Sequence, residues 1–220
     1  MLVGDFQPTK RWREQGFAPK RGQLARKGEQ MGKFFENLGL VLIVGVALAV
    51  LIAVFPDSGY RPPTGDLLNG ILQWLHVFFG ITWIGLLYYF NFVQIPTMPK
   101  VPAELKPGVS KYIAPSALFY FRWGAAFTVL TGLLLAWSYG ELREAMELQP
   151  SARLIGIGMW LALIMAFNVW FVIWPNQKKV LGIIAADDAA KAKAARTAMI
   201  FSRTNTLLSI PMLLAMTNAH

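Results

Sequence analysis

Five apolar stretches recur along the chain, each close to the roughly 20 residues that a helix needs to cross the hydrocarbon core of a bilayer. They lie at residues 38–55, 68–95, 116–137, 154–174 and 199–216. Connectors such as PDSGYRPPTGD and QIPTMPKVPAELKPG are rich in Pro, Gly and charged residues, which break helices and carry polar backbone into water. The pattern predicts an all-α transmembrane protein, a five-helix bundle, with a basic tail at residues 1–37 and a membrane domain at residues 38–220.

The orientation follows from Lys and Arg, which are retained on the cytoplasmic side of short loops. Sixteen of them lie in the tail and in the loops at 96–112 and 175–197, whereas the two opposite loops hold only Arg61, Arg143 and Arg153. This bias predicts a cytoplasmic N terminus and, with five spans, a C terminus outside. The net charge of +9 is then explained by topology and not by a nucleic-acid partner. A basic inner rim also favours contact with anionic lipids of the bilayer.

The first 37 residues do not resemble a secretory signal, because the segment before the apolar stretch is long and mixed in composition. Such a tail is normally disordered in isolation. Two interpretations stay open. The tail packs on itself or on lipid, or it docks on another membrane protein subunit.

Cysteine is absent from the chain, which excludes a covalently attached c-type heme, an iron–sulfur cluster and any disulfide. Redox chemistry would therefore have to use histidine, methionine or a bound quinone.

The chain has only two histidines, His76 and His220, and the predicted topology places both toward the outer face. Gly80 follows His76 by four residues and lies on the same helix face, where a missing side chain leaves room for a flat macrocycle. An ionisable residue inside a membrane raises the hypothesis of a functional site. The alternative is that His76 only hydrogen-bonds a neighbouring helix.

A second polar group is predicted toward the inner half of the spans. No Asp or Glu lies within any span to pair with its two arginines, so heme propionates, lipid phosphate, a quinone head group or an anionic substrate could meet them. The alternative is that both arginines reach to the cytoplasmic interface. Met212 and Met216 are interpreted as packing residues rather than ligands. The polar group consists of Asn91, Gln94, Arg122, Asn168, Arg203 and Asn205.

Four motifs in order give the chain a family resemblance. LHVFFGITWIGLLYYFNF, FRWGAAFTVLTG, AFNVWFVIWPNQKKV and RTNTLLSIPMLLAMTNAH resemble the membrane domain of the bacterial membrane-bound urate hydroxylases, which carry a C-terminal cytochrome c domain. The resemblance covers about residues 70–220. Thr204 stands where the family usually has a histidine, and because the sequence ends at His220 we expect a shortened form that lacks the cytochrome c domain. The positions that match family residues are His76, Asn168, Asn176, Gln177, Asn205 and His220.

The resemblance implies redox-linked chemistry at the periplasmic face of a bacterial inner membrane. We therefore expect an integral membrane electron-transfer subunit that binds heme b through His76, with His220 as second ligand, and that works with a periplasmic cytochrome c. Gly80, Arg122 and Arg203 are the further residues expected around the heme. The alternative is a non-catalytic accessory subunit of a larger respiratory or photosynthetic complex. A stand-alone urate oxidase ranks third, because the sequence identifies no base poised to take a proton from urate.

Overall fold

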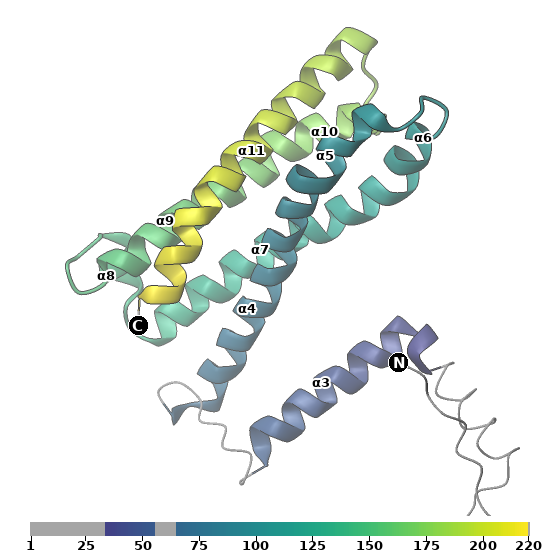
Figure 1. Ribbon diagram of the computed structural model, residues 1–220. Coiled ribbons are helices and arrows are strands. Elements are labelled where there is room, and N and C mark those ends of the chain that lie inside the picture. Colours follow the sequence, from purple (N-terminus) through teal and green to yellow (C-terminus); the bar gives the residue numbers. More distant parts are fainter. Residues whose placement is uncertain (1–33, 56–64, 220) are drawn as a thin grey trace, which may run out of the picture. The chain divides into compact units, whose positions relative to one another are not determined.

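The computed structural model describes residues 34–55 and 65–219, and these residues are helical apart from short turns, which confirms the all-α class (Figure 1). Nearly all of the basic tail and His220, the second predicted ligand, lie outside the described residues. The chain divides into two units, residues 1–61 and 62–220, and each is described by itself.

Helix α3 (Leu38–Val54) is the described part of the first unit that corresponds to the first predicted span. The side chain of Asn37 caps its start by accepting a hydrogen bond from the backbone N–H of Leu40 at 3.1 Å. With 17 residues, α3 is at the short end of what crosses a bilayer.

Four helical segments in the second unit are long and apolar enough to cross a membrane, as a multi-pass membrane protein requires. Each includes one of the other four predicted apolar stretches and extends beyond it at both ends. A short helix, α8 (Leu142–Met146), lies between the second and third segments. The four segments are Leu67–Lys100, Lys106–Ser138, Arg153–Val180 and Asp188–Asn218. Their main helices are α4 (Leu67–Tyr88), α7 (Ala114–Ser138), α9 (Arg153–Phe167), α10 (Trp174–Val180) and α11 (Asp188–Asn218).

Prolines explain why three of these segments contain π turns. A proline cannot donate a backbone hydrogen bond, and its ring clashes with the carbonyl four residues earlier in a regular α-helix. Before Pro175 the chain widens, so that the N–H of Trp174 bonds the carbonyl of Val169, five residues back. The same widening precedes Pro96 and Pro115, and it allows the helices to continue past these residues. The π turns are η3 (Tyr89–Gln94), η5 (Val109–Ile113) and η6 (Asn168–Ile173). Between η3 and η5 lie the short helices α5 (Ile95–Thr97), η4 (Met98–Lys100) and α6 (Lys106–Gly108).

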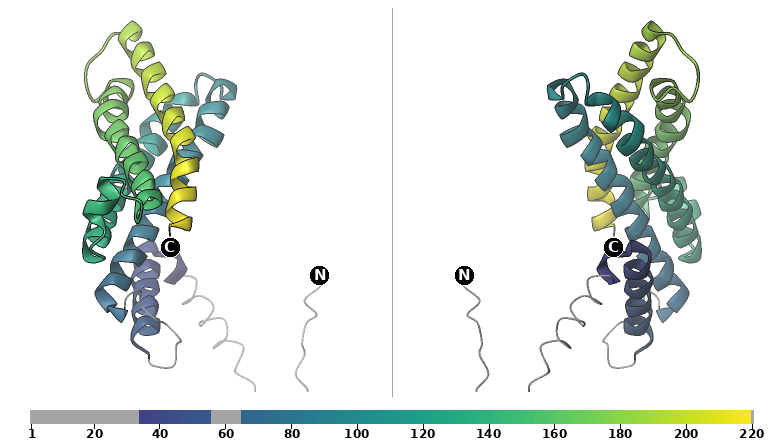
Figure 2. Two further views of the ribbon diagram at one scale, coloured as in Figure 1. Left: turned by 90° about the vertical axis from the view of Figure 1, so that its left-hand side faces the viewer. Right: turned by 90° about the vertical axis from the view of Figure 1, so that its right-hand side faces the viewer.

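The second unit is built from two antiparallel helix pairs, α4 with α7 and α9–α10 with α11 (Figures 1 and 2). Small residues let the helices approach closely. A Cβ added at Gly124 of α7 would lie 3.2 Å from the backbone nitrogen of Trp83 in α4, and a Cβ at Gly156 of α9 would collide with the carbonyl oxygen of Ala145 in α8. These close contacts between backbones are typical of helices packed in a membrane.

Polar side chains join the two helix pairs. The hydroxyl groups of Tyr88 and Ser209 lie 2.9 Å apart, and the side-chain amide of Asn91 donates to the hydroxyl of Ser202 at 2.8 Å. Within the second pair, Asn205 is fully buried. It accepts a hydrogen bond from Asn168 at 2.8 Å and donates one to the carbonyl of Met165 at 2.9 Å. These contacts give the inner asparagines a structural role.

Candidate functional site

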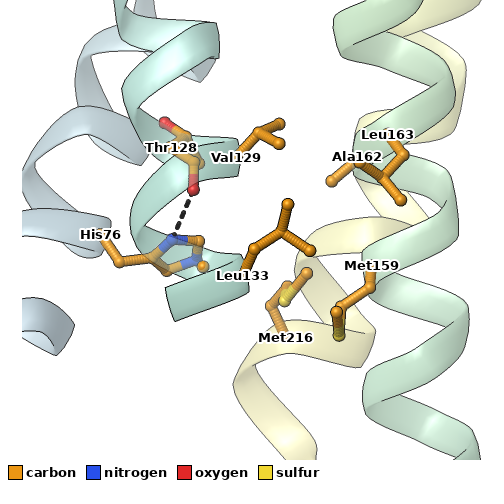
Figure 3. A pocket seen from close by; sticks show the side chains of 9 residues that line it. His76, Thr128, Val129, Leu133, Met159, Ala162, Leu163 and Met216 are labelled. Carbon is orange, nitrogen blue, oxygen red and sulfur yellow. Dashed lines mark hydrogen bonds between the residues drawn. The ribbon is translucent and has the colours of Figure 1, made fainter. Parts of the chain in front are cut away.

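His76 is the centre of the candidate site. Its Nδ1 atom lies 2.9 Å from the backbone carbonyl oxygen of Thr128 on α7 (Figure 3). Because a carbonyl only accepts hydrogen bonds, Nδ1 carries the proton and Nε2 of the neutral ring keeps its lone pair. No partner for Nε2 occurs among the described residues. A metal-binding histidine has this arrangement, with one nitrogen fixed by a carbonyl and the other free to act as ligand.

Gly132 provides the space that the imidazole occupies. A Cβ at this position would lie 2.8 Å from Cε1 and 3.0 Å from Nδ1 of His76. Carbon atoms in favourable contact are about 3.5–4.0 Å apart. Any larger residue at position 132 would therefore displace the ring from its hydrogen bond.

The imidazole borders a cavity of about 570 Å³ between the two helix pairs. Pockets that bind small molecules and cofactors measure about 300–1,000 Å³ and are mostly apolar. One wall belongs to α4 and α7, with His76 and Gly80. The opposite wall belongs to α8, α9 and α11, and it includes Met159, Met212 and Met216. Figure 3 shows Met159 and Met216 across the narrow part of the pocket from His76.

Glycines keep the first wall of the cavity flat. A Cβ at Gly80 would meet only the Cγ2 atom of Thr128, at 3.9 Å, and a Cβ at Gly85 would meet nothing within 4 Å. Nothing in the fold therefore demands glycine at these two positions, and side chains there would project into open space.

Polar residues line one end of the cavity, where Tyr139 follows α7, Glu141 precedes α8 and Thr217 lies near the end of α11. This is the end that the charge bias assigns to the outside. In the segment that connects α7 to α9, hydrogen bonds from Arg143 and Gln149 hold the pKa of the Glu147 carboxyl below its ordinary value.

The residues that line the cavity suit a heme. The donor set suits heme iron, since histidine and methionine are both common axial ligands. Trp83, whose buried indole N–H has no acceptor among the described residues, also lines the cavity and could donate to a polar group of a ligand. The volume and the flat glycine wall suit a planar group.

The other predicted heme residues are not gathered here. Arg122 is not among the residues that line the cavity, and its guanidinium carbon lies 3.4 Å from the centre of the Trp174 ring, a cation–π contact. One of its terminal nitrogens is buried without a partner in the described part of the chain. Arg203 is exposed on α11 and is also absent from the lining. His220 lies outside the described residues, three positions after Thr217.

The sequence did not identify Thr128 and Gly132 as parts of the site. Thr128 contributes only its backbone carbonyl, and every residue type has a backbone carbonyl. Gly132 matters only because it faces His76 in the folded protein. The spacing of Gly124, Thr128 and Gly132 at four-residue intervals is typical of a close-packing helix face, and this signal could have identified them. The spacing does not indicate what packs against that face.

Comparison with known proteins gives one match. Residues 145–220 match the family described as urate oxidase N-terminal. The match covers less than half of the chain and includes the whole of α9, α10 and α11, but not His76. It supports a relation to urate oxidase-like proteins over this part. No curated protein and no solved structure matches the chain.

Proposed function

We propose that this protein is an integral membrane electron-transfer subunit that binds heme b through His76 and exchanges electrons with a periplasmic cytochrome c. The observation that carries the proposal is the hydrogen bond from Nδ1 of His76 to the Thr128 carbonyl, which leaves the lone pair of Nε2 available on a ring that borders a cavity large enough for a cofactor. The resemblance to urate hydroxylases, membrane proteins with an attached cytochrome c, supports the redox assignment.

A heme bound there would supply one-electron redox chemistry. The Thr128 carbonyl fixes the orientation of the imidazole and increases the basicity of Nε2. Apolar residues on both walls exclude water, and the low dielectric influences the redox potential. The position of the cavity near the predicted outer ends of the helices brings it close to a partner in the periplasm.

A reduced-minus-oxidised spectrum of the full chain, purified in mild detergent, tests the proposal. We expect a heme b spectrum in the wild-type protein and its loss in His76→Ala. Gln73→Ala is the matched control, since Gln73 lines the same cavity one turn earlier on α4 and is not a ligand in this proposal. If the wild-type protein holds no heme, or if His76→Ala keeps it, the electron-transfer proposal is wrong. The accessory-subunit reading would then replace it.

Urate oxidation is the second candidate, and two observations favour it. Residues 145–220 match the urate oxidase N-terminal family, and the carboxylate of Glu141 lies at the polar end of the cavity, where a base could meet a substrate. The test is urate consumption by the purified protein with an added electron acceptor. Activity that is absent in Glu141→Gln but present in the neighbouring Glu144→Gln would support this candidate, and no activity in the wild-type protein would exclude it.

A further inference from the structure

The cavity has two walls, and only one of them carries a histidine. His76 projects from α4, and the described part of the opposite wall, built from α8, α9 and α11, contains no histidine. A planar group bound by His76 would lie between the two walls, so a second axial ligand has to come from the opposite side. Met159, Met212 and Met216 supply the thioethers on that wall.

Met216 is the best placed of the three. It lines both the large cavity and the narrow pocket beside the imidazole, as Met159 also does, whereas Met212 lines only the large cavity. Met159 is 7% exposed and packs in a small apolar cluster with Ala145 and Ala152. Met216 is only half-buried, and Figure 3 shows its side chain across the pocket from His76.

Gly158 of α9 makes room for the Met216 side chain. A Cβ at Gly158 would lie 3.3 Å from the terminal methyl carbon of Met216 and 3.1 Å from the Cβ of Ala215. The absence of a side chain at Gly158 therefore lets α11 approach α9 and lets the Met216 thioether pack against this wall. A thioether whose motion is restricted by packing loses less conformational entropy when it binds a metal.

We infer that Met216 is the second axial ligand of a heme held by His76, in place of His220. The inference rests on the proposed function. The thioether sulfur would donate a lone pair to the iron on the face opposite Nε2, and no proton or electron is transferred in forming this bond. Thioether ligation raises the potential of a heme relative to two imidazoles. A high-potential heme would suit electron transfer to a c-type cytochrome.

The experiment compares Met216→Leu, Met212→Leu and His220→Ala with the wild-type protein, all as full-length chains in mild detergent. Leucine conserves the volume of methionine, so the packing of α11 is kept. We expect Met216→Leu to retain heme, to lose the charge-transfer band of a thioether-ligated ferric heme, to bind carbon monoxide when reduced and to show a lower midpoint potential. Met212→Leu and His220→Ala should match the wild-type protein in all four readouts.

Two outcomes overturn the inference, and they are distinguishable. If the wild-type protein binds heme but Met216→Leu leaves the band, the potential and carbon monoxide binding unchanged, the ligand assignment is wrong and the proposed function stands. If only His220→Ala changes the spectrum and the potential, the ligand assignment is likewise wrong, and His220 is the second ligand. If the wild-type protein binds no heme, the proposed function fails and the inference fails with it. Should Met216→Leu not fold, Met216→His keeps a ligand at this position and should restore a six-coordinate heme of lower potential.

Discussion

Replacement of Gly132 by alanine is the most direct test of the site, because one methyl group is added beside the imidazole. The new Cβ would lie 2.8 Å from Cε1 and 3.0 Å from Nδ1 of His76. The ring has to move by several tenths of an ångström or more, and the 2.9 Å bond to Thr128 would stretch toward the distance at which a hydrogen bond is lost.

The magnitude follows from two contributions. Loss of the hydrogen bond costs about 0.5–1.5 kcal/mol, and overpacking of a filled site costs about 1–3 kcal/mol. The free energy of unfolding should fall by roughly 2–4 kcal/mol in total. The affinity for the heme proposed above should also fall by about 10–100-fold, because the imidazole would lose its orienting carbonyl.

The assay measures thermal unfolding in detergent, with Gly80→Ala as the matched control for stability. Gly80 lines the same cavity, and its added methyl would meet only the Cγ2 atom of Thr128, at 3.9 Å. Any gain of up to about 1 kcal/mol in helix propensity is common to both variants and cancels in the comparison. The ratio of heme to protein is compared between Gly132→Ala and the wild-type protein, because Gly80 itself lies on the wall proposed to face the heme. Equal melting temperatures in the two variants would refute the steric reasoning.

Three further predictions follow from contacts elsewhere. Gly156→Ala should destabilise the protein by about 3 kcal/mol, because the backbone carbonyl of Ala145 in α8 cannot move away as a flexible side chain would. Thermal unfolding measures this loss of stability. The control Gly85→Ala should be neutral, since a Cβ at Gly85 would meet open space. Asn205→Ala should cost about 1–3 kcal/mol, since it removes two buried hydrogen bonds; a denaturation midpoint equal to the wild-type value would contradict this. The chain has no cysteine, so single cysteines introduced in place of Glu144 and Lys179 can report the membrane topology. A membrane-impermeant maleimide applied to intact cells should label the cysteine at position 144 only. Labelling at position 179 only would show that the predicted orientation is wrong.

The long helices were predictable from the sequence because apolar length is a direct physical requirement of a bilayer. The apolar stretch at 154–174 falls inside the segment Arg153–Val180. The ends were less predictable. Pro175 suggested the end of a helix, yet the π turn η6 lets the segment continue to Val180. A widened turn depends on the backbone geometry around the proline, and no residue pattern announces it.

The candidate site was half predictable. His76 stood out because a titratable group is costly inside an apolar helix, and Gly80 followed from helical periodicity. The Thr128 carbonyl, Gly132 and the opposite methionine wall depend on how α4 is placed against α7 and how the two helix pairs pack. Those arrangements bring together residues more than 50 positions apart, and one sequence contains no record of them.

The position of the cavity between the two helix pairs has a consequence for assembly. A ligand there would contact both pairs at once and would act as part of the interface that joins them. Binding would therefore stabilise the association of the pairs by about 2.7 kcal/mol at a ligand concentration 100 times the dissociation constant. Biogenesis of the protein would then be coupled to cofactor supply, with cofactor-free chains held together only by the direct contacts between the pairs and removed preferentially by membrane proteases.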